Sequence, residues 1–171
     1  YKGLDLLLDA WAQLRRAGRT EGRRLIVAGE FYTAREPYLN RIADNGLQDE
    51  VLLHDRFIPD DDVKYYFSAA DFVVQPYKTA TQSGVTQIAY QFCVPMVVTK
   101  VGGLAEIVPD GRVGYVCEPT PEGVAGAIER MYEGDTLQRF RENCVEERRR
   151  FSWEEMCSRV TELYGLVASG K

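Results

Sequence analysis

Residues 71–114 constrain the fold more than any other part of this 171-residue chain. An apolar run at residues 72–74 ends before Pro76, and a second run at residues 96–98 follows Pro95. Between them the apolar positions recur with the spacing of one helix face; they are Val85, Ile88, Ala89 and Phe92. A strand, a helix and a second strand in this order predict a βαβ unit with parallel strands.

The rest of the chain repeats this alternation. Short apolar runs predict strands at residues 25–28, 51–54, 72–75, 96–98 and 113–117. Amphipathic spacing predicts helices at residues 3–17, 37–45, 60–70, 85–92, 121–134 and 137–150. A terminal helix from Ser152 is expected to turn its apolar residues inward, namely Met156, Val160, Leu163 and Tyr164. We therefore predict an α/β fold with a doubly wound, Rossmann-like parallel sheet, followed at residues 120–171 by a helical extension of the same domain.

The composition indicates one domain with free thiols. Hydrophobic residues make up 45% of the chain, and the net charge of −5 argues against a nucleic-acid binder held by bulk electrostatics. The cysteines, Cys93, Cys117, Cys144 and Cys157, show no C-x-x-C spacing, which favours reduced thiols in a cytoplasmic protein. The one histidine, His54, cannot make a histidine-based metal site, and we expect it to be packed in its strand. No apolar run has membrane-spanning length.

Ligands of doubly wound sheets bind outside the carboxyl ends of the strands. This rule places residues 29–30, 57–58, 75–84 and 101–106 on one rim. The turn at Ser83 begins a helix whose unpaired N–H groups and dipole suit a diphosphate, although an ordinary helix cap explains it equally well. Lys2 suits a phosphate as a compact positive charge, and Gly102 with Gly103 allows the backbone to approach a ligand closely. The alternative for Lys2 is an ordinary surface lysine. The alternative for the two glycines is a plain turn after a strand.

Several short motifs also occur in a specific order. Residues 1–5 resemble a K-G-x-x-x-L-L-x-A segment, residues 25–30 a V-x-G-x-G strand end, residues 57–60 a G-F-V-P strand end and residues 68–71 the motif A-A-A-D. Residues 94–99 resemble G-V-P-V-V-A-T, and residues 101–108 resemble V-G-G-x-x-E-I-V. Together they resemble the C-terminal, nucleotide-sugar-binding domain of a GT-B glycosyltransferase of retaining family 4, also named glycosyl transferases group 1. The resemblance covers nearly the whole chain.

The resemblance implies a set of donor-binding residues: Lys2, Gly29, Glu30, Phe57, Ile58, Gln82, Ser83, Gly84, Val85, Gly102 and Gly103. Lys2 and the backbone at the helix start would stabilise the leaving diphosphate, while Phe57 and Ile58 would line the base. Two glutamates eight residues apart usually flank this helix start in the family, but Ala80 and Ile88 occupy those positions here. Residues 82–84 instead resemble a variant subgroup, which leaves the usual sugar contacts unassigned.

The implied function is transfer of a hexose-type sugar from a nucleoside diphosphate to a glycan or lipid-linked acceptor. We expect neither a metal nor another cofactor, and we assign no catalytic residue within this domain. The resemblance also implies a missing first strand and a missing N-terminal acceptor domain, so that the chain alone would be inactive. The full-length enzyme would be cytoplasmic, with peripheral association at the inner membrane surface. A nucleotide-sugar epimerase of the same fold and a non-catalytic nucleotide-binding or signalling domain remain the alternatives.

Overall fold

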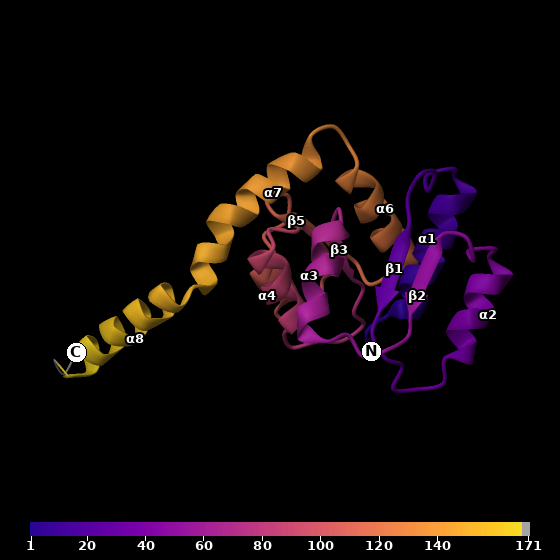
Figure 1. Ribbon diagram of the computed structural model, residues 1–171. Helices are drawn as coiled ribbons and strands as arrows, with labels where there is room; N and C mark the ends of the chain where they lie inside the picture. The colour runs from indigo at the N-terminus through magenta and orange to yellow at the C-terminus, as the bar shows by residue number, and fades with distance from the viewer. Residues whose placement is uncertain (169–171) are drawn as a thin grey trace.

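The structure is a computed structural model that describes residues 1–168. Short strands and helices alternate along the chain up to β5, after which the chain is helical (Figure 1). The strands are β1 (Leu25–Ala28), β2 (Val51–His54), β3 (Val73–Gln75), β4 (Met96–Thr99) and β5 (Gly114–Cys117). The helices are α1 (Leu4–Arg16), α2 (Glu36–Asp44), α3 (Asp60–Ala69), α4 (Gly84–Gln91), α5 (Leu104–Ile107), α6 (Pro121–Met131), α7 (Thr136–Glu147), the 3-10 helix η1 (Arg148–Phe151) and α8 (Trp153–Ala168).

All strand pairs are parallel, which confirms the predicted α/β class. The strands hydrogen-bond as two separate sheets, one of order β1-β2 and the other of order β3-β4-β5. In the first sheet Leu25 is the partner of Val51, and in the second Val73 is the partner of Met96. The two sheets lie on either side of the chain's N-terminus in Figure 1.

The three-stranded sheet is covered on both faces, as parallel sheets require. Every residue of β4 is buried. Met96 and Val98 belong to a core cluster with Tyr90 of α4 and Leu104 of α5, whereas Val97 belongs to a different cluster. That second cluster contains residues of β5, α6 and α7, namely Tyr115, Ala127, Met131 and Phe140. Successive residues of β4 therefore fill the cores on opposite faces of the sheet.

The two-stranded sheet is covered on one face only. Its inner positions begin with Leu25 and Val51, which are buried in the cluster formed with α1, α2 and α6. The alternate positions are open: Ile26 is 41% exposed and Leu52 is 42% exposed. His54 lies on this open face because strand residues alternate, so the expectation of a packed histidine was wrong. Its Nδ1 lies 2.9 Å from the hydroxyl oxygen of Tyr66 on α3.

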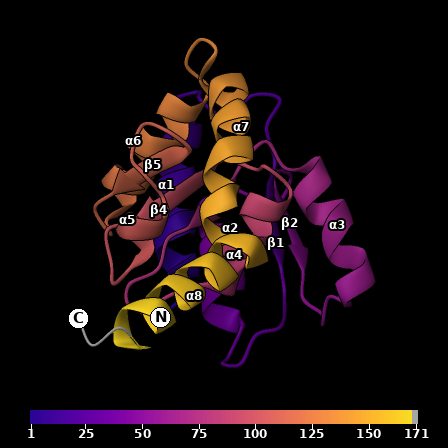
Figure 2. The same cartoon turned by 90° about the vertical axis from the view of Figure 1, so that its left-hand side faces the viewer.

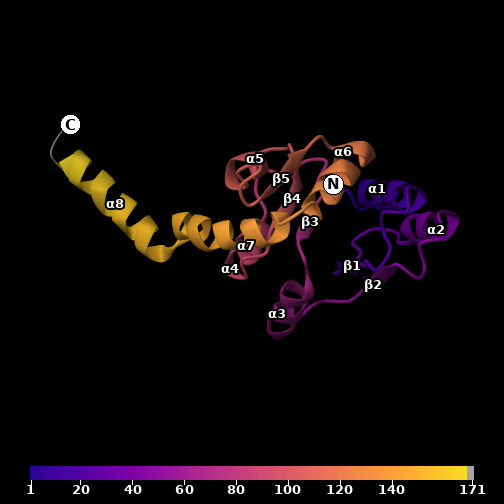
Figure 3. The same ribbon diagram turned by 90° about the horizontal axis from the view of Figure 1, so that it is seen from above.

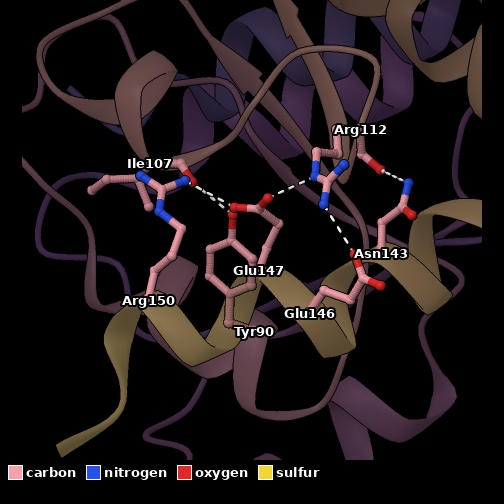
Figure 4. A network of polar contacts seen from close by, with 7 residues as sticks. All are labelled: Tyr90, Ile107, Arg112, Asn143, Glu146, Glu147 and Arg150. Atoms are coloured by element: carbon pink, nitrogen blue, oxygen red, sulfur yellow. Dashed lines mark hydrogen bonds and ion pairs between the residues drawn. The ribbon is translucent and has the colours of Figure 1, made fainter. Parts of the chain in front are cut away.

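A polar network connects α7 and η1 to the segment between α5 and β5 (Figure 4). Arg112 pairs with Glu146 at 3.0 Å and with Glu147 at 2.6 Å, and Asn143 donates to the Arg112 carbonyl at 2.7 Å. Glu147 also forms an ion pair with Arg150, at 2.9 Å. These contacts and the buried side chain of Phe140 hold α7 against the rest of the domain.

The terminal helix α8 corrects an expectation from the sequence. Its apolar side chains do not face a core: Met156 is 48% exposed, Val160 60%, Leu163 61% and Tyr164 75%. The helix projects away from both sheets in Figures 1 and 3 and continues beyond α7 on the near side of Figure 2. The apolar spacing correctly predicted a helix, but the described elements leave these four side chains largely exposed.

Cys93, in the turn between α4 and β4, is the one non-glycine residue with a positive φ among residues 1–168, at 52°. This left-handed conformation costs a residue with a Cβ about 1 kcal/mol or more, and costs glycine little. We expect Cys93→Gly to be about 1 kcal/mol more stable than Cys93→Ala, because both lose the thiol and only alanine keeps the strain. Urea unfolding of the two variants checks this, and an alanine variant as stable as the glycine variant would contradict it.

Candidate functional site

A pocket of about 440 Å³ lies at the carboxyl end of β3, beside the start of α1. Its lining residues come from the first two positions of the chain and from the loop between β3 and α4; they are Tyr1, Lys2, Tyr77, Thr79, Ala80, Thr81 and Gln82. Lys2 and Gln82 are both members of the binding set expected from the sequence. The pocket therefore brings together residues about 80 positions apart in the chain, on the rim where the fold class places ligands.

Close backbone contacts hold the start of the chain at this rim. The carbonyl oxygen of Tyr1 accepts a hydrogen bond from the backbone N–H of Lys78 at 2.9 Å. Gly3 has a φ of 71°, and a Cβ at this position would lie 1.9 Å from the carbonyl oxygen of Pro76. Only glycine permits both this conformation and this approach. Lys2, between Tyr1 and Gly3, is consequently fixed beside the loop after β3.

The side chain of Lys2 reaches Tyr77. Its Nζ donates to the Tyr77 hydroxyl at 2.9 Å and lies 4.2 Å from the centre of that ring. The same hydroxyl lies 3.2 Å from the Oγ of Ser83. Tyr77 is only 5% exposed. Tyr77 was absent from the binding set expected from the sequence. The one feature that could have indicated it is its position directly after Pro76, at the end of a strand.

The start of α4 differs from an ordinary capped helix. Ser83 occupies the N-cap position with extended backbone, but its side chain caps no backbone N–H. Its hydroxyl instead contacts Tyr77, whereas Thr120 at the start of α6 accepts a hydrogen bond from the backbone N–H of Gly123 at 3.1 Å. At Gly84 a Cβ would meet no atom within 4 Å. The first turn of α4, with Val85, thus leaves its backbone without a side-chain cap at the positive end of the helix dipole.

Gly102 and Gly103, in the loop after β4, pack against the loop between β3 and α4 that lines the pocket. A Cβ on Gly102 would lie 1.7 Å from the carbonyl oxygen of Ala80, and Gly102 has a φ of 50°. The backbone N–H of Gly103 donates to the carbonyl of Thr81 at 3.0 Å. These glycines therefore pack closely against the loop that lines the pocket, and the close approach of a ligand to them stays a prediction.

The remaining residues of the expected set lie at the carboxyl ends of β1 and β2, in the other sheet. Gly29 donates through its backbone to the carbonyl of His54 at 3.2 Å. Glu30 is exposed, Phe57 is 66% exposed, and Ile58 is half-buried. None of the four lines the 440 Å³ pocket. The assignment of Phe57 and Ile58 to the base, and of Gly29 and Glu30 to the donor-binding set, stays a prediction.

The two positions where the family usually has glutamates provide no charge here. Ala80 is half-buried and lines the pocket, and Ile88 is half-buried on α4. Within residues 1–168, no group of three histidine, cysteine, aspartate or glutamate side chains gathers as a candidate metal site. In the same residues, no helix has both the length and the apolar character to cross a bilayer.

Sequence relatives are glycosyltransferases. A D-inositol 3-phosphate glycosyltransferase 2 of Catenulispora acidiphila is 32% identical over 175 residues, covering 95% of this chain and 40% of that protein. A D-inositol 3-phosphate glycosyltransferase of Corynebacterium diphtheriae is 28% identical over 98% of this chain and 40% of its own length. The chain thus spans about 40% of these relatives.

Solved structures show the same fold. Anabaena HepE in complex with UDP superposes with a TM-score of 0.79 at 22% identity, over 96% of this chain and 45% of that one. The C-terminal domain of a group 1 glycosyl transferase, LpcC, from Francisella tularensis gives a TM-score of 0.73 at 19% identity, over 85% of this chain and 77% of that one. The fold is therefore that of a GT-B C-terminal domain. The family profile described as glycosyl transferases group 1 matches residues 1–134, more than half of the sequence, and the chain accordingly belongs to that family.

Proposed function

We propose that this chain binds the nucleoside diphosphate sugar donor of a group 1 glycosyltransferase, with the diphosphate in the pocket beside α4. The observation that carries this proposal is the placement of the Lys2 ammonium, through Tyr77, next to the uncapped first turn of a helix. A fixed cation and free backbone N–H groups are the two features that phosphate sites share. Both would oppose the negative charge that develops on a leaving diphosphate.

Relatives support this choice of ligand. The HepE structures contain UDP, UDP with glucose, or UDP-glucose. Relatives at 26–32% identity are named as D-inositol 3-phosphate glycosyltransferases. We infer that the whole protein moves a hexose-type sugar from its nucleotide to a glycan or lipid-linked acceptor in the cytoplasm. In this proposal Lys2 and the α4 dipole supply the positive charge, so that no metal is required.

We further propose that one more parallel strand of the whole protein belongs between β1 and β3. Among residues 1–168, β1 pairs only with β2 and β3 pairs only with β4, so each of these two strands has an unpaired edge. The hydrogen bond between Lys78 and Tyr1 places the chain leading into Tyr1 beside β3. Amide hydrogen exchange at β1 and β3 must slow when the upstream polypeptide is present; unchanged exchange would refute the added strand.

The Lys2→Met variant tests the diphosphate site, because methionine keeps the stem and removes the charge. We expect UDP to bind the 171-residue chain with a dissociation constant in roughly the millimolar range, and the variant to bind about tenfold more weakly. An NMR titration with UDP measures both. Lys64→Met on α3, another exposed lysine next to an aromatic ring, is the matched control and should leave the affinity unchanged. Equal affinities for wild type and Lys2→Met would contradict the site.

The activity of the whole protein requires an acceptor site, which we place in the polypeptide outside this chain. Two-domain transferases assemble the reaction site by closing donor and acceptor halves on each other. We therefore expect the 171-residue chain to consume no nucleotide sugar by transfer to an acceptor, and the full-length enzyme to do so. Sugar transfer by the isolated chain, detected by mass spectrometry of acceptor products, would contradict this part of the proposal.

A further inference from the structure

We propose that Tyr77 is a positioning residue of the donor site: its hydroxyl holds the Lys2 ammonium at the start of α4, where the diphosphate binds. This inference rests on the proposed function and adds a residue to it. Tyr77 contacts Lys2 at 2.9 Å and Ser83 at 3.2 Å through one oxygen atom. Tyr77 therefore connects the cation of Lys2 with the start of α4 at Ser83, two features about 80 residues apart in the chain.

The chemistry of the groups fixes the direction of the hydrogen bond between Lys2 and Tyr77. An ammonium has only protons to give, so the Tyr77 oxygen accepts from Lys2. The Tyr77 and Ser83 hydroxyl oxygens lie 3.2 Å apart, and either hydroxyl can be the donor between them. A hydrogen bond to a charged donor is stronger than a neutral one, so the Lys2–Tyr77 contact is the stronger of the two. The result is a continuous series of hydrogen bonds from the cation through the phenol to the helix start.

Tyr77 is itself held rigidly. The hydroxyl of Thr99, a fully buried residue on β4, donates to the backbone carbonyl of Tyr77 at 2.6 Å. The next residue, Lys78, donates its N–H to Tyr1 and pairs through Nζ with Asp5 at 2.5 Å. The Tyr77 ring is buried in the cluster that also contains Ala89 and Tyr90 of α4. A phenol fixed in this way is a suitable support for a flexible lysine.

The fold needs the ring of Tyr77 more than it needs the hydroxyl. The ring is part of the core cluster, whereas the hydroxyl points to an exposed lysine at the pocket. Without the hydroxyl, Lys2 would keep only its contact with the face of the ring, 4.2 Å from Nζ to the ring centre, and would lose the hydrogen bond that fixes its place beside α4. Removing the hydroxyl should therefore impair ligand binding far more than folding.

The test is a double-mutant cycle with Tyr77→Phe and Lys2→Met in the 171-residue chain, titrated with UDP and with uridine. We expect Tyr77→Phe alone to raise the dissociation constant for UDP about five- to tenfold and to leave any shifts caused by uridine unchanged. In the Lys2→Met background the same substitution should change the UDP constant less than twofold, because Tyr77 acts through Lys2. Tyr115→Phe on β5, another largely buried tyrosine, is the matched control and should have no effect on UDP.

The outcomes separate the two proposals. If the wild-type chain shows no UDP-dependent shifts, the proposed function fails and this inference fails with it. If UDP binds and Lys2→Met weakens it while Tyr77→Phe does not, only the role of Tyr77 is refuted. An equal loss from Tyr77→Phe in both backgrounds, or a loss that extends to uridine, would also refute positioning and would indicate a general structural effect.

Discussion

Substitution of Gly102 by alanine is expected to lower the free energy of unfolding by about 4 kcal/mol and to abolish detectable UDP binding. Two costs add at this position. The backbone has a φ of 50°, and the new Cβ would meet the backbone of Ala80 at 1.7 Å from the carbonyl oxygen and 2.7 Å from the carbonyl carbon. Backbone atoms cannot rotate away as a side-chain tip can, so the pocket loop must move.

The Gly111→Ala variant separates these two costs. Gly111 has a φ of 73°, and a Cβ there would meet no atom within 4 Å. We expect it to lose only about 1 kcal/mol from backbone strain. Chemical denaturation of both variants gives the comparison. Equal losses at the two glycines would show that the contact between Gly102 and the pocket loop does not restrict the fold.

The Phe140→Ala variant is expected to destabilise the protein by about 3–5 kcal/mol. Phe140 on α7 is fully buried, and its ring packs edge-on against Tyr115 of β5 with centroids 5.2 Å apart. Alanine would leave a cavity between α7 and the sheet, and would remove the aromatic contact as well. Thermal and urea unfolding measure the loss.

Val145→Ala on the same helix is the control for Phe140→Ala. Val145 is 42% exposed, so its truncation should change stability by about 0.5 kcal/mol or less. A small effect at Phe140, comparable with that at Val145, would mean that α7 contributes little to the packed body. The ion pairs of Arg112 would then be its main attachment.

The strands could be located from the sequence because each is a short apolar run between turn residues. The predicted strand at residues 51–54 is the observed β2, and the predicted run at residues 96–98 lies within β4. The orientation of α8 could not be predicted in the same way. Its spacing showed an apolar face, but whether another element covers such a face depends on the tertiary structure.

The candidate site was predictable only in part. The strand-end rule predicted the rim on which Gln82 and Gly102 lie, whereas Lys2 was named for its charge and from the family resemblance. The role of Tyr77 was not predicted, because a hydrogen bond between side chains 75 positions apart leaves no periodic pattern in the sequence. The hydroxyl of Ser83 was ambiguous for a related reason: a serine before a helix indicates a cap, and only the arrangement of neighbours shows that it contacts Tyr77 instead.

The hydrogen bond between Tyr1 and Lys78 has a practical consequence for work with this protein. Any affinity tag or fusion partner joined ahead of Tyr1 would emerge directly beside the pocket, next to Lys2. Bulk or histidine-rich sequence there would crowd the opening and place extra imidazole groups near the candidate phosphate position. The far end of α8 lies well away from both sheets in Figure 1, and attachment there leaves the pocket unobstructed for immobilisation, labelling or fluorescence assays.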